Sequence, residues 1–317
     1  MTLDEIMSQI EEANSILILS HENPDGDALG SSLAMYNFLK SIGKDAEVVM
    51  HKYPANFSYL PGIEEIKTEP SREIFDMAIA MDCPDTHRIS DYIDWFENAK
   101  VKVSIDHHNK NTMFADFNYV NPVAPACCEI VVGVFKYLNI EFTKDIIKCL
   151  LTGIITDTNG FRNAGITADT FDFAAKALEE GVNVSKIYRQ ALMTMTKTRF
   201  EVQKLVSERL EFYEDGKITF TYINKEDDEK IGIKTGDHEG MVEIGRDIEG
   251  VEISIFASER EEGLYKVSFR ANDYVDVSDI CLMFGGGGHI RAAGCFVQGT
   301  LETVREKVLQ ESKKHLK

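Results

Sequence analysis

Four short apolar runs in the first half of the chain constrain its fold more than any other feature. They cover residues 16–19, 77–81, 101–105 and 150–155, and each is followed closely by Asp or His. Short apolar runs of this kind are typical of buried parallel strands. Because ligands of an open α/β sheet gather at the carboxyl ends of its strands, we expect the polar residues after these runs to meet in one place.

The polar residues that follow the runs are of the types that bind divalent cations. They are His21, Asp25 and Asp27 after the first run, Asp82 after the second, Asp106, His107 and His108 after the third, and Asp157 after the fourth. Mixed imidazole and carboxylate sets bind hard or borderline divalent metal ions. Taken singly, Asp25, Asp27 or Asp82 could instead cap a helix or a turn. Their shared place at predicted strand ends favours one metal site.

Predicted strands and helices alternate through residues 1–187. Helical spacing of apolar residues predicts helices over 28–42, 129–138 and 167–180. Strands are predicted at 46–50, 74–82, 101–106 and 150–156 in addition to the first run. Repeated βα units predict an α/β fold with a doubly wound, mainly parallel sheet.

The rest of the chain predicts a linker and a second domain. Residues 188–214 are expected to form a helical linker, with one long helix over 197–213. Residues 215–317 predict a smaller α/β domain with a mixed sheet. Its strands are expected at 217–223, in an antiparallel pair at 251–258 and 264–271, and near 295–298, followed by a helix over 301–315.

Composition limits the partners of the protein. The formal net charge of −19 opposes tight binding to long nucleic acid, which needs a basic track, but does not oppose a small anionic substrate. No apolar stretch approaches the ~20 residues of a membrane-spanning helix, and the first residues lack the features of a signal peptide. The six cysteines form no C-x-x-C pair. We therefore expect a cytoplasmic protein with reduced thiols and no membrane partner.

A run of four glycines, 285–288, stands before His289 in the second domain. A helix beginning at His289 would let the backbone N–H groups of the run approach a phosphate closely, and a merely flexible loop is the alternative. The predicted substrate-binding residues are Gly286, Gly287, Gly288, His289, Arg270, Arg88 and Arg291. Arg270 is the second candidate clamp for an anion, and a surface ion pair is its alternative role.

The ordered motifs resemble those of the DHH phosphoesterases. The motifs are His-x-x-x-Asp-x-Asp at 21–27, the strand-end Asp82, Asp-His-His at 106–108 and Thr-Gly-Ile-Ile-Thr-Asp-Thr at 152–158. The sequence GGGGHIRAAG at 285–294 resembles the signature of the DHH-associated C-terminal domain. The resemblance spans nearly the whole chain. In its size and its two predicted domains, the chain most resembles the bifunctional oligoribonuclease and PAP phosphatase branch of the family, the nanoRNases.

This resemblance implies two divalent metal ions, with manganese the expected metal. Matching motif positions would give one ion His21, Asp25 and Asp82, and would give the other Asp27, Asp82, His107 and Asp157, with Asp82 bridging. Asp106 would orient a neighbouring imidazole from behind. His108 would contact the scissile phosphate or protonate the leaving oxygen, and a buried hydrogen bond is its alternative role.

The resemblance also implies an activity, namely attack by hydroxide assisted by two metals. The expected reactions are hydrolysis of dinucleotides and oligonucleotides of a few residues to mononucleotides, and removal of the 3′-phosphate from 3′-phosphoadenosine 5′-phosphate (PAP). Linearised cyclic dinucleotides are further candidates. The alternatives are a family-II-type inorganic pyrophosphatase, a non-catalytic nucleotide sensor and a processive single-strand exonuclease. The sequence leaves open the preferred substrate, the cleavage polarity, RNA against DNA, and monomer against homodimer.

Overall fold

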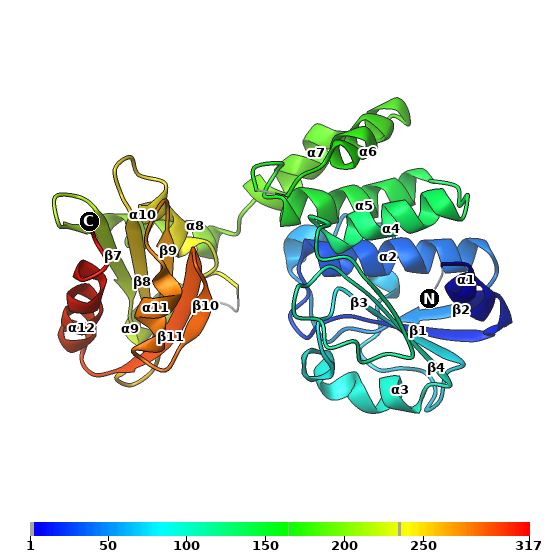
Figure 1. The fold of residues 1–317 in the computed structure, drawn as a ribbon, viewed down its shortest axis with the longest axis horizontal. Helices are drawn as coiled ribbons and strands as arrows, with labels where there is room; N and C mark the ends of the chain where they lie inside the picture. Colours follow the sequence, from blue (N-terminus) through cyan, green and yellow to red (C-terminus); the bar gives the residue numbers. More distant parts are fainter. Residues whose placement is uncertain (1–2, 164, 234–235) are drawn as a thin grey trace. The chain divides into compact units, whose positions relative to one another are not determined.

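The protein forms two compact units, Met1–Thr194 and Met195–Lys317, shown in Figure 1. The computed structural model describes residues 3–163, 165–233 and 236–317. The segment predicted as a helical linker, 188–214, is shared between the units. Its short π-helix η4 (Arg189–Met193) belongs to the first unit, and helix α8 (Lys197–Glu208) belongs to the second.

The first unit is built on a five-stranded parallel sheet. Its strands are β1 (Ser15–Leu19), β2 (Asp45–Val48), β3 (Met77–Met81), β4 (Val101–Asp106) and β5 (Phe117–Val120), in the spatial order β2-β1-β3-β4-β5. Every residue of β1 and β3 is buried, which explains their continuous apolar sequence. The strand order reverses direction between β1 and β3. Loops diverge at such a point and leave a crevice at the carboxyl edge of the sheet.

Helices cover both faces of this sheet (Figure 1). One face packs against α2 (Gly26–Ser41), α4 (Cys127–Tyr137) and α5 (Lys144–Asp157), and the same core includes α1 (Leu3–Glu12), α6 (Ala168–Glu179) and α7 (Val184–Tyr188). The other face packs against the 3-10 segment η3 (Thr86–Tyr92) and α3 (Ile93–Asn98). The short 3-10 turns η1 (Ala55–Phe57) and η2 (Ile63–Glu65) lie between β2 and β3. The predicted doubly wound arrangement is confirmed.

Helices α2 and α5 approach each other closely through two glycines. A Cβ atom on Gly30 would lie 2.5 Å from the carbonyl oxygen of Cys149. One on Gly153 would lie 2.6 Å from Asp27 Oδ1 and would also overlap the Cys128 sulfur. Real Cβ atoms do not tolerate such separations, so these glycines set how near α5 can come to the start of α2.

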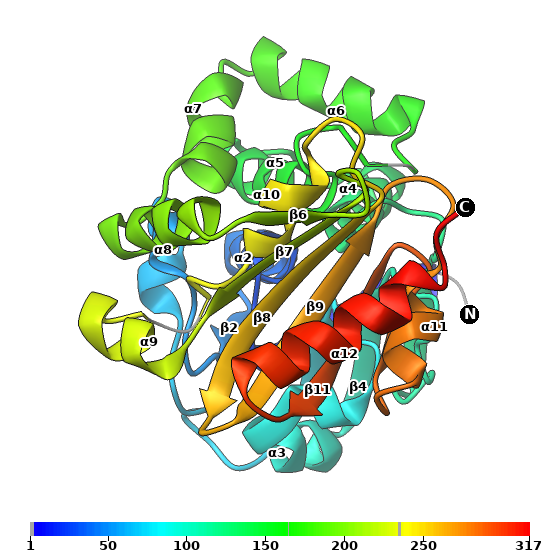
Figure 2. The same cartoon turned by 90° about the vertical axis from the view of Figure 1, so that its left-hand side faces the viewer.

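The second unit contains a six-stranded mixed sheet. Its strands are β6 (Glu211–Tyr213), β7 (Ile218–Ile223), β8 (Ile253–Glu261), β9 (Leu264–Ala271), β10 (Gly287–His289) and β11 (Ala292–Gln298), in the order β10-β11-β9-β8-β7-β6. Among the described strands of this sheet, only β7 and β8 pair in parallel. Helices α11 (Val277–Leu282) and α12 (Leu301–Lys313) pack on one face, and α12 crosses β9 and β11 in Figure 2. Helices α8, α9 (Lys225–Ile231) and α10 (Met241–Arg246) pack against β7 and β8 on the other.

Two predictions of secondary structure in the first unit and the linker were wrong. Residues 150–156 belong to helix α5, which Thr143 caps at its start. The apolar residues of this helix are buried around most of its circumference, so their continuous run resembles that of a buried strand. The helix predicted over 197–213 ends at Glu208, and residues 211–213 pair with β7 instead. Strand β5 was not predicted, because all of its residues are only half-buried. No helix in the described part of the chain is long and apolar enough to cross a membrane.

Replacing Gly153 by alanine is expected to lower the free energy of unfolding by about 1–3 kcal/mol, because the added methyl group overpacks the contact between α2 and α5. The matched control is Gly133→Ala in α4, where an added Cβ meets no atom within 4 Å. That control should raise stability by about 0.5–1 kcal/mol through helix propensity. Urea unfolding measures both. Equal stability changes in the two variants would contradict the packing role of Gly153.

Candidate metal centre

The carboxyl edge of the first sheet brings together all six predicted metal ligands. Their ligand atoms form three groups in which all atoms lie within 4.8 Å of one another. The groups are His21, Asp25 and Asp82; Asp27, His107 and Asp157; and Asp82, His107 and His108. The fourth predicted strand end is a helix end, because Asp157 is the last residue of α5. It still reaches the site, since the α2–α5 contact places it beside Asp27.

His107 stands at the centre of the carboxylates. Its Nε2 lies 3.3 Å from Asp157 Oδ2, 3.5 Å from Asp82 Oδ1 and 3.9 Å from Asp27 Oδ2. Its Nδ1 lies 3.2 Å from the carbonyl oxygen of Ala124. Because a carbonyl only accepts, Nδ1 carries the proton and Nε2 presents a lone pair to the carboxylates. This is the orientation that a metal-binding imidazole needs.

Asp27 is held by the start of helix α4. The backbone N–H groups of Cys127 and Cys128 donate to its two carboxylate oxygens at 2.6 and 2.9 Å. Free N–H groups at a helix start favour negative charge, so α4 fixes the fully buried Asp27 in place. The sequence carried no signal of this contact, since the donors are main-chain groups.

Asp25 combines the two roles that the sequence left as alternatives. Its Oδ1 accepts from the backbone N–H groups of Asp27 and Ala28 at 2.9 and 3.1 Å and so caps α2. Its carboxylate also belongs to the group with His21 and Asp82. Within that group, Asp82 Oδ2 lies 3.8 Å from His21 Nε2. Capping thus orients the carboxylate toward the other ligands.

The carboxylates are crowded without a compensating charge. Burial, followed by the charges of neighbouring aspartates, raises the pKa of Asp82 well above its usual range and raises the pKa of Asp157 to about 9. Burial also raises the pKa of Asp27. The buried atoms Asp82 Oδ1 and His21 Nδ1 have no hydrogen-bond partner among the described residues. Crowded oxygens with unmet bonding capacity and a mixed N/O donor set fit divalent cations.

The backbone of Asp82 is strained as well. Its φ of 52° lies in the left-handed region, which residues other than glycine seldom adopt. Such strain persists only where the surroundings enforce it, and it concentrates at functional sites. Here it turns the side chain that follows β3 toward His21 and His107.

His108, Asp106 and Asn111 form a chain of hydrogen bonds beside the ligands. His108 Nδ1 lies 2.7 Å from Asp106 Oδ1, and Asn111 Nδ2 donates to Asp106 Oδ2 at 2.7 Å. Although burial raises the pKa of Asp106, these hydrogen bonds bring it below its ordinary value, so the group is a carboxylate. The His108 proton therefore sits on Nδ1, and Nε2 is left for another partner. Sequence reasoning missed Asn111.

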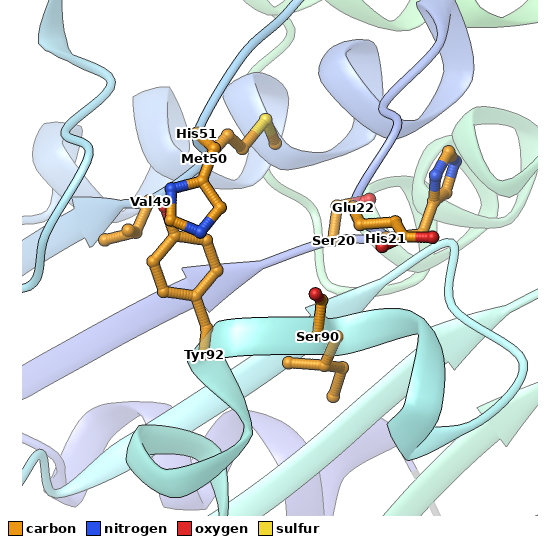
Figure 3. A pocket seen from close by; sticks show the side chains of 9 residues that line it. Ser20, His21, Glu22, Val49, Met50, His51, Ser90 and Tyr92 are labelled. Carbon is orange, nitrogen blue, oxygen red and sulfur yellow. The ribbon is translucent and has the colours of Figure 1, made fainter.

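A small hollow lies behind His21 (Figure 3). Its volume of about 10 Å³ holds no more than a single water molecule. The ring of His51 stacks on Tyr92 at one end, with 4.5 Å between ring centroids. Arg88 is close enough to affect His21. Burial is the main cause that lowers the pKa of His21; the positive charge of Arg88 lowers it further, and the charge of Asp25 opposes both effects. A lowered pKa keeps His21 neutral and able to bind metal.

The predicted substrate-binding residues of the second unit lie around β9, β10 and β11. Arg270 Nε donates to Glu243 Oε1 at 2.9 Å, which is the ion pair foreseen as its alternative role. Arg291 donates to the carbonyl oxygen of Val275 at 2.6 Å and to that of Asp273, so it braces a turn.

The prediction of a helix beginning at His289 is wrong. Residues 287–289 form strand β10 and pair with 292–294 of β11. A Cβ on Gly286 would collide with the carbonyl oxygen of Gly294, and Gly288 has a φ of 152°. The glycines therefore allow a tight hairpin, in which Gly287 and His289 remain exposed.

Comparisons with known proteins agree with this geometry. Residues 15–154 match the DHH family, N-terminal domain, and residues 215–317 match the DHHA1 domain. The chain is 32% identical over 316 residues to the bifunctional oligoribonuclease and PAP phosphatase NrnA of Thermus thermophilus. The matched region covers 98% of this chain and 93% of that protein. The chain belongs to the DHH family.

Further relatives support the same assignment. The NrnA of Mycoplasma pneumoniae is 25% identical over 321 residues, covering 99% of this chain and 97% of that protein. The crystal structure of an exopolyphosphatase-related protein from Bacteroides fragilis has a TM-score of 0.90 and 27% identity, covering 98% and 95% of the two chains. The resemblance seen in the motifs is confirmed, and this DHH protein is a hydrolase of phosphoester bonds.

Without a cation, the stability of this DHH protein is expected to fall as pH rises from 7 to 8. Folded Asp157 has a pKa of about 9, whereas an unfolded aspartate ionises near 3.9. The unfolded state therefore binds fewer protons in this range, and stability declines with pH until the folded group has ionised. Urea unfolding in EDTA measures the slope.

Two controls accompany that measurement. Asp157→Asn should reduce the slope in EDTA, and manganese should raise the unfolding midpoint of the unaltered protein at pH 8. A flat profile in EDTA, together with a midpoint indifferent to manganese, would contradict the crowded-carboxylate account.

Proposed function

We propose that this protein hydrolyses short oligonucleotides to mononucleotides and removes the 3′-phosphate from PAP, using two divalent cations with manganese preferred. The observation that supports the proposal most is the sharing of Asp82 and His107 among the ligand groups, which suits a paired-metal centre. The names of the relatives from T. thermophilus and M. pneumoniae supply the substrate classes.

The ligands divide between two ions. His21, Asp25 and Asp82 would hold one, and Asp27, Asp82, His107 and Asp157 would hold the other. Four carboxylates and two divalent ions sum to zero charge, so the loaded centre can accept an anionic phosphate. When bound, such ions supply Lewis-acid activation of water and offset charge on the phosphoryl oxygens.

His108 contributes the proton-handling group. Its Nδ1 proton is committed to Asp106, so it is not free to bind metal through that atom. The side chain is 36% exposed, which lets Nε2 reach a bound phosphate. The Asp106 carboxylate would stabilise the imidazolium form of His108, which can donate its Nε2 proton to the leaving oxygen and become neutral. Asn111 keeps Asp106 in place.

We assign metal binding and catalysis to residues 1–187 and substrate binding to residues 215–317. Residues 188–214 link these two parts. In the second part, Gly286, Gly287, Gly288 and His289 are retained as candidates for substrate contact, with Arg270 available if its pair with Glu243 opens. The net charge of −19 favours substrates too short to need a basic track. A cytoplasmic location is also part of the proposal, supported by six cysteines that form no disulfide.

The deciding experiment compares kcat/KM of the manganese-loaded protein for four substrates. These are a dinucleotide, PAP, inorganic pyrophosphate and a linearised cyclic dinucleotide. We expect turnover of the dinucleotide and PAP, and loss of both after EDTA treatment with recovery on adding manganese. Activity confined to pyrophosphate would replace the proposal with the pyrophosphatase alternative.

His108→Ala is expected to lower kcat for the dinucleotide by about 10²–10⁴-fold, because a positioned proton donor is lost. Manganese binding, measured by calorimetry, should stay within about twofold because His108 Nδ1 is bonded to Asp106. His87→Ala is the matched control, since His87 is an exposed histidine of the same unit. Equal loss of metal affinity and kcat in His108→Ala would make it a ligand instead.

A further inference from the structure

The second unit has a stretch of sheet that no helix covers. Side chains of β9 and β11 alternate: Tyr265, Val267 and Phe269 point into the core, with Ala293, Cys295 and Val297 opposite them. On the outer face, α10 covers β8, where Ser254 donates to the carbonyl oxygen of Val242. The cover ends at the Arg270–Glu243 pair. The outer face of β9, β11 and β10 is therefore open among the described residues.

The open face has a floor of small residues with a different chemical group at each end. Gly294 lies opposite Ser268 and Gly287 at its middle. Arg270 and His289 flank Ala292 at one end, and Lys266 lies opposite Phe296 at the other. Strand residues on one face repeat every second position, so all these side chains point outward.

The end formed by Lys266 and Phe296 is hollow. A depression of about 360 Å³ is lined by Lys266, Phe284, Phe296 and the glycines 285–287 and 294. This volume lies within the ~300–1,000 Å³ of small-molecule sites. A Cβ on Gly285 or Gly287 would meet nothing within 4 Å, so the space beside the run is unfilled.

The chemistry of this end suits a nucleotide. Phe296 is 57% exposed, which leaves ring surface on which a base can stack. Lys266 forms no ion pair with any described residue, so its ammonium is available to a phosphate. An exposed aromatic ring beside an unpaired cation is the combination that binds single-stranded nucleic acid without regard to sequence.

The two ends are far enough apart to hold different nucleotides. Lys266 and Arg270 are four residues apart on β9, which corresponds to roughly 13 Å along the strand. Stacked nucleotides advance by about 3.4 Å per step. About four such steps, and so five stacked nucleotides, cover this distance, whereas one nucleotide at the Arg270–His289 end does not reach Phe296.

We infer that Lys266 and Phe296 form a second nucleotide subsite, in which Phe296 stacks on a base and Lys266 pairs with a phosphate of an oligonucleotide substrate. The inference rests on the proposed function and deepens it, because it concerns substrate length. PAP contains a single nucleoside, so PAP bound at the Arg270–His289 end does not extend to this subsite. The subsite thus favours oligonucleotides over the bisphosphate.

The test compares KM for a pentanucleotide and for PAP in Phe296→Ala, Phe296→Trp and Lys266→Gln. We expect the ratio of the two KM values to rise about tenfold in Phe296→Ala and to be restored in Phe296→Trp. Lys266→Gln should raise the pentanucleotide KM and reduce the salt slope of its binding by about one. Phe212→Ala is the matched control, because Phe212 is a 54% exposed phenylalanine on β6 of the same unit.

A binding measurement separates this inference from the proposed activity. Fluorescence anisotropy of a 5′-fluorescein-labelled pentanucleotide in EDTA requires no turnover, and Phe296→Ala should weaken binding about tenfold. If the unaltered protein hydrolyses neither substrate, the proposed function fails while the binding result still decides the subsite. Unchanged binding in Phe296→Ala, or an equal rise of both KM values, would overturn the inference.

Discussion

The repulsion among buried aspartates at the carboxyl edge of the first sheet is the constraint on which the rest of the site depends. Asp27 and Asp82 are almost completely buried, and Asp157 is held beside them. Desolvation and mutual charge disfavour their ionised forms, as the raised pKa values show. The fold nevertheless keeps them together, because each is fixed by its own element: a helix start, a strained turn and a helix end.

Much of this arrangement could be predicted from the sequence. The runs ending at Leu19, Met81 and Ile105 became parallel strands, and their polar followers converge because parallel strands share one carboxyl edge. The fourth run became a helix, yet Asp157 still joined the others. Its place depends on glycines at the α2–α5 contact, and close packing between two helices leaves no periodic signal in either one.

What the sequence could not show is how the predicted metal ligands are held. Backbone N–H groups of Cys127 and Cys128 orient Asp27, and the carbonyl of Ala124 fixes the proton of His107. Main-chain donors and acceptors are present at almost every residue, so only the fold determines which of them matter. The helix predicted at His289 was wrong for a related reason: a close approach of backbone to backbone in a hairpin requires glycine, and the sequence does not distinguish this need from the approach of a ligand.

The left-handed backbone at Asp82 has a consequence for how this position can evolve. Aspartate and asparagine tolerate that conformation better than other residues with a side chain, because their short polar groups bond locally. Asparagine could thus take over the position with little cost to the turn while removing its charge. Most other replacements would destabilise the turn and remove the negative charge together.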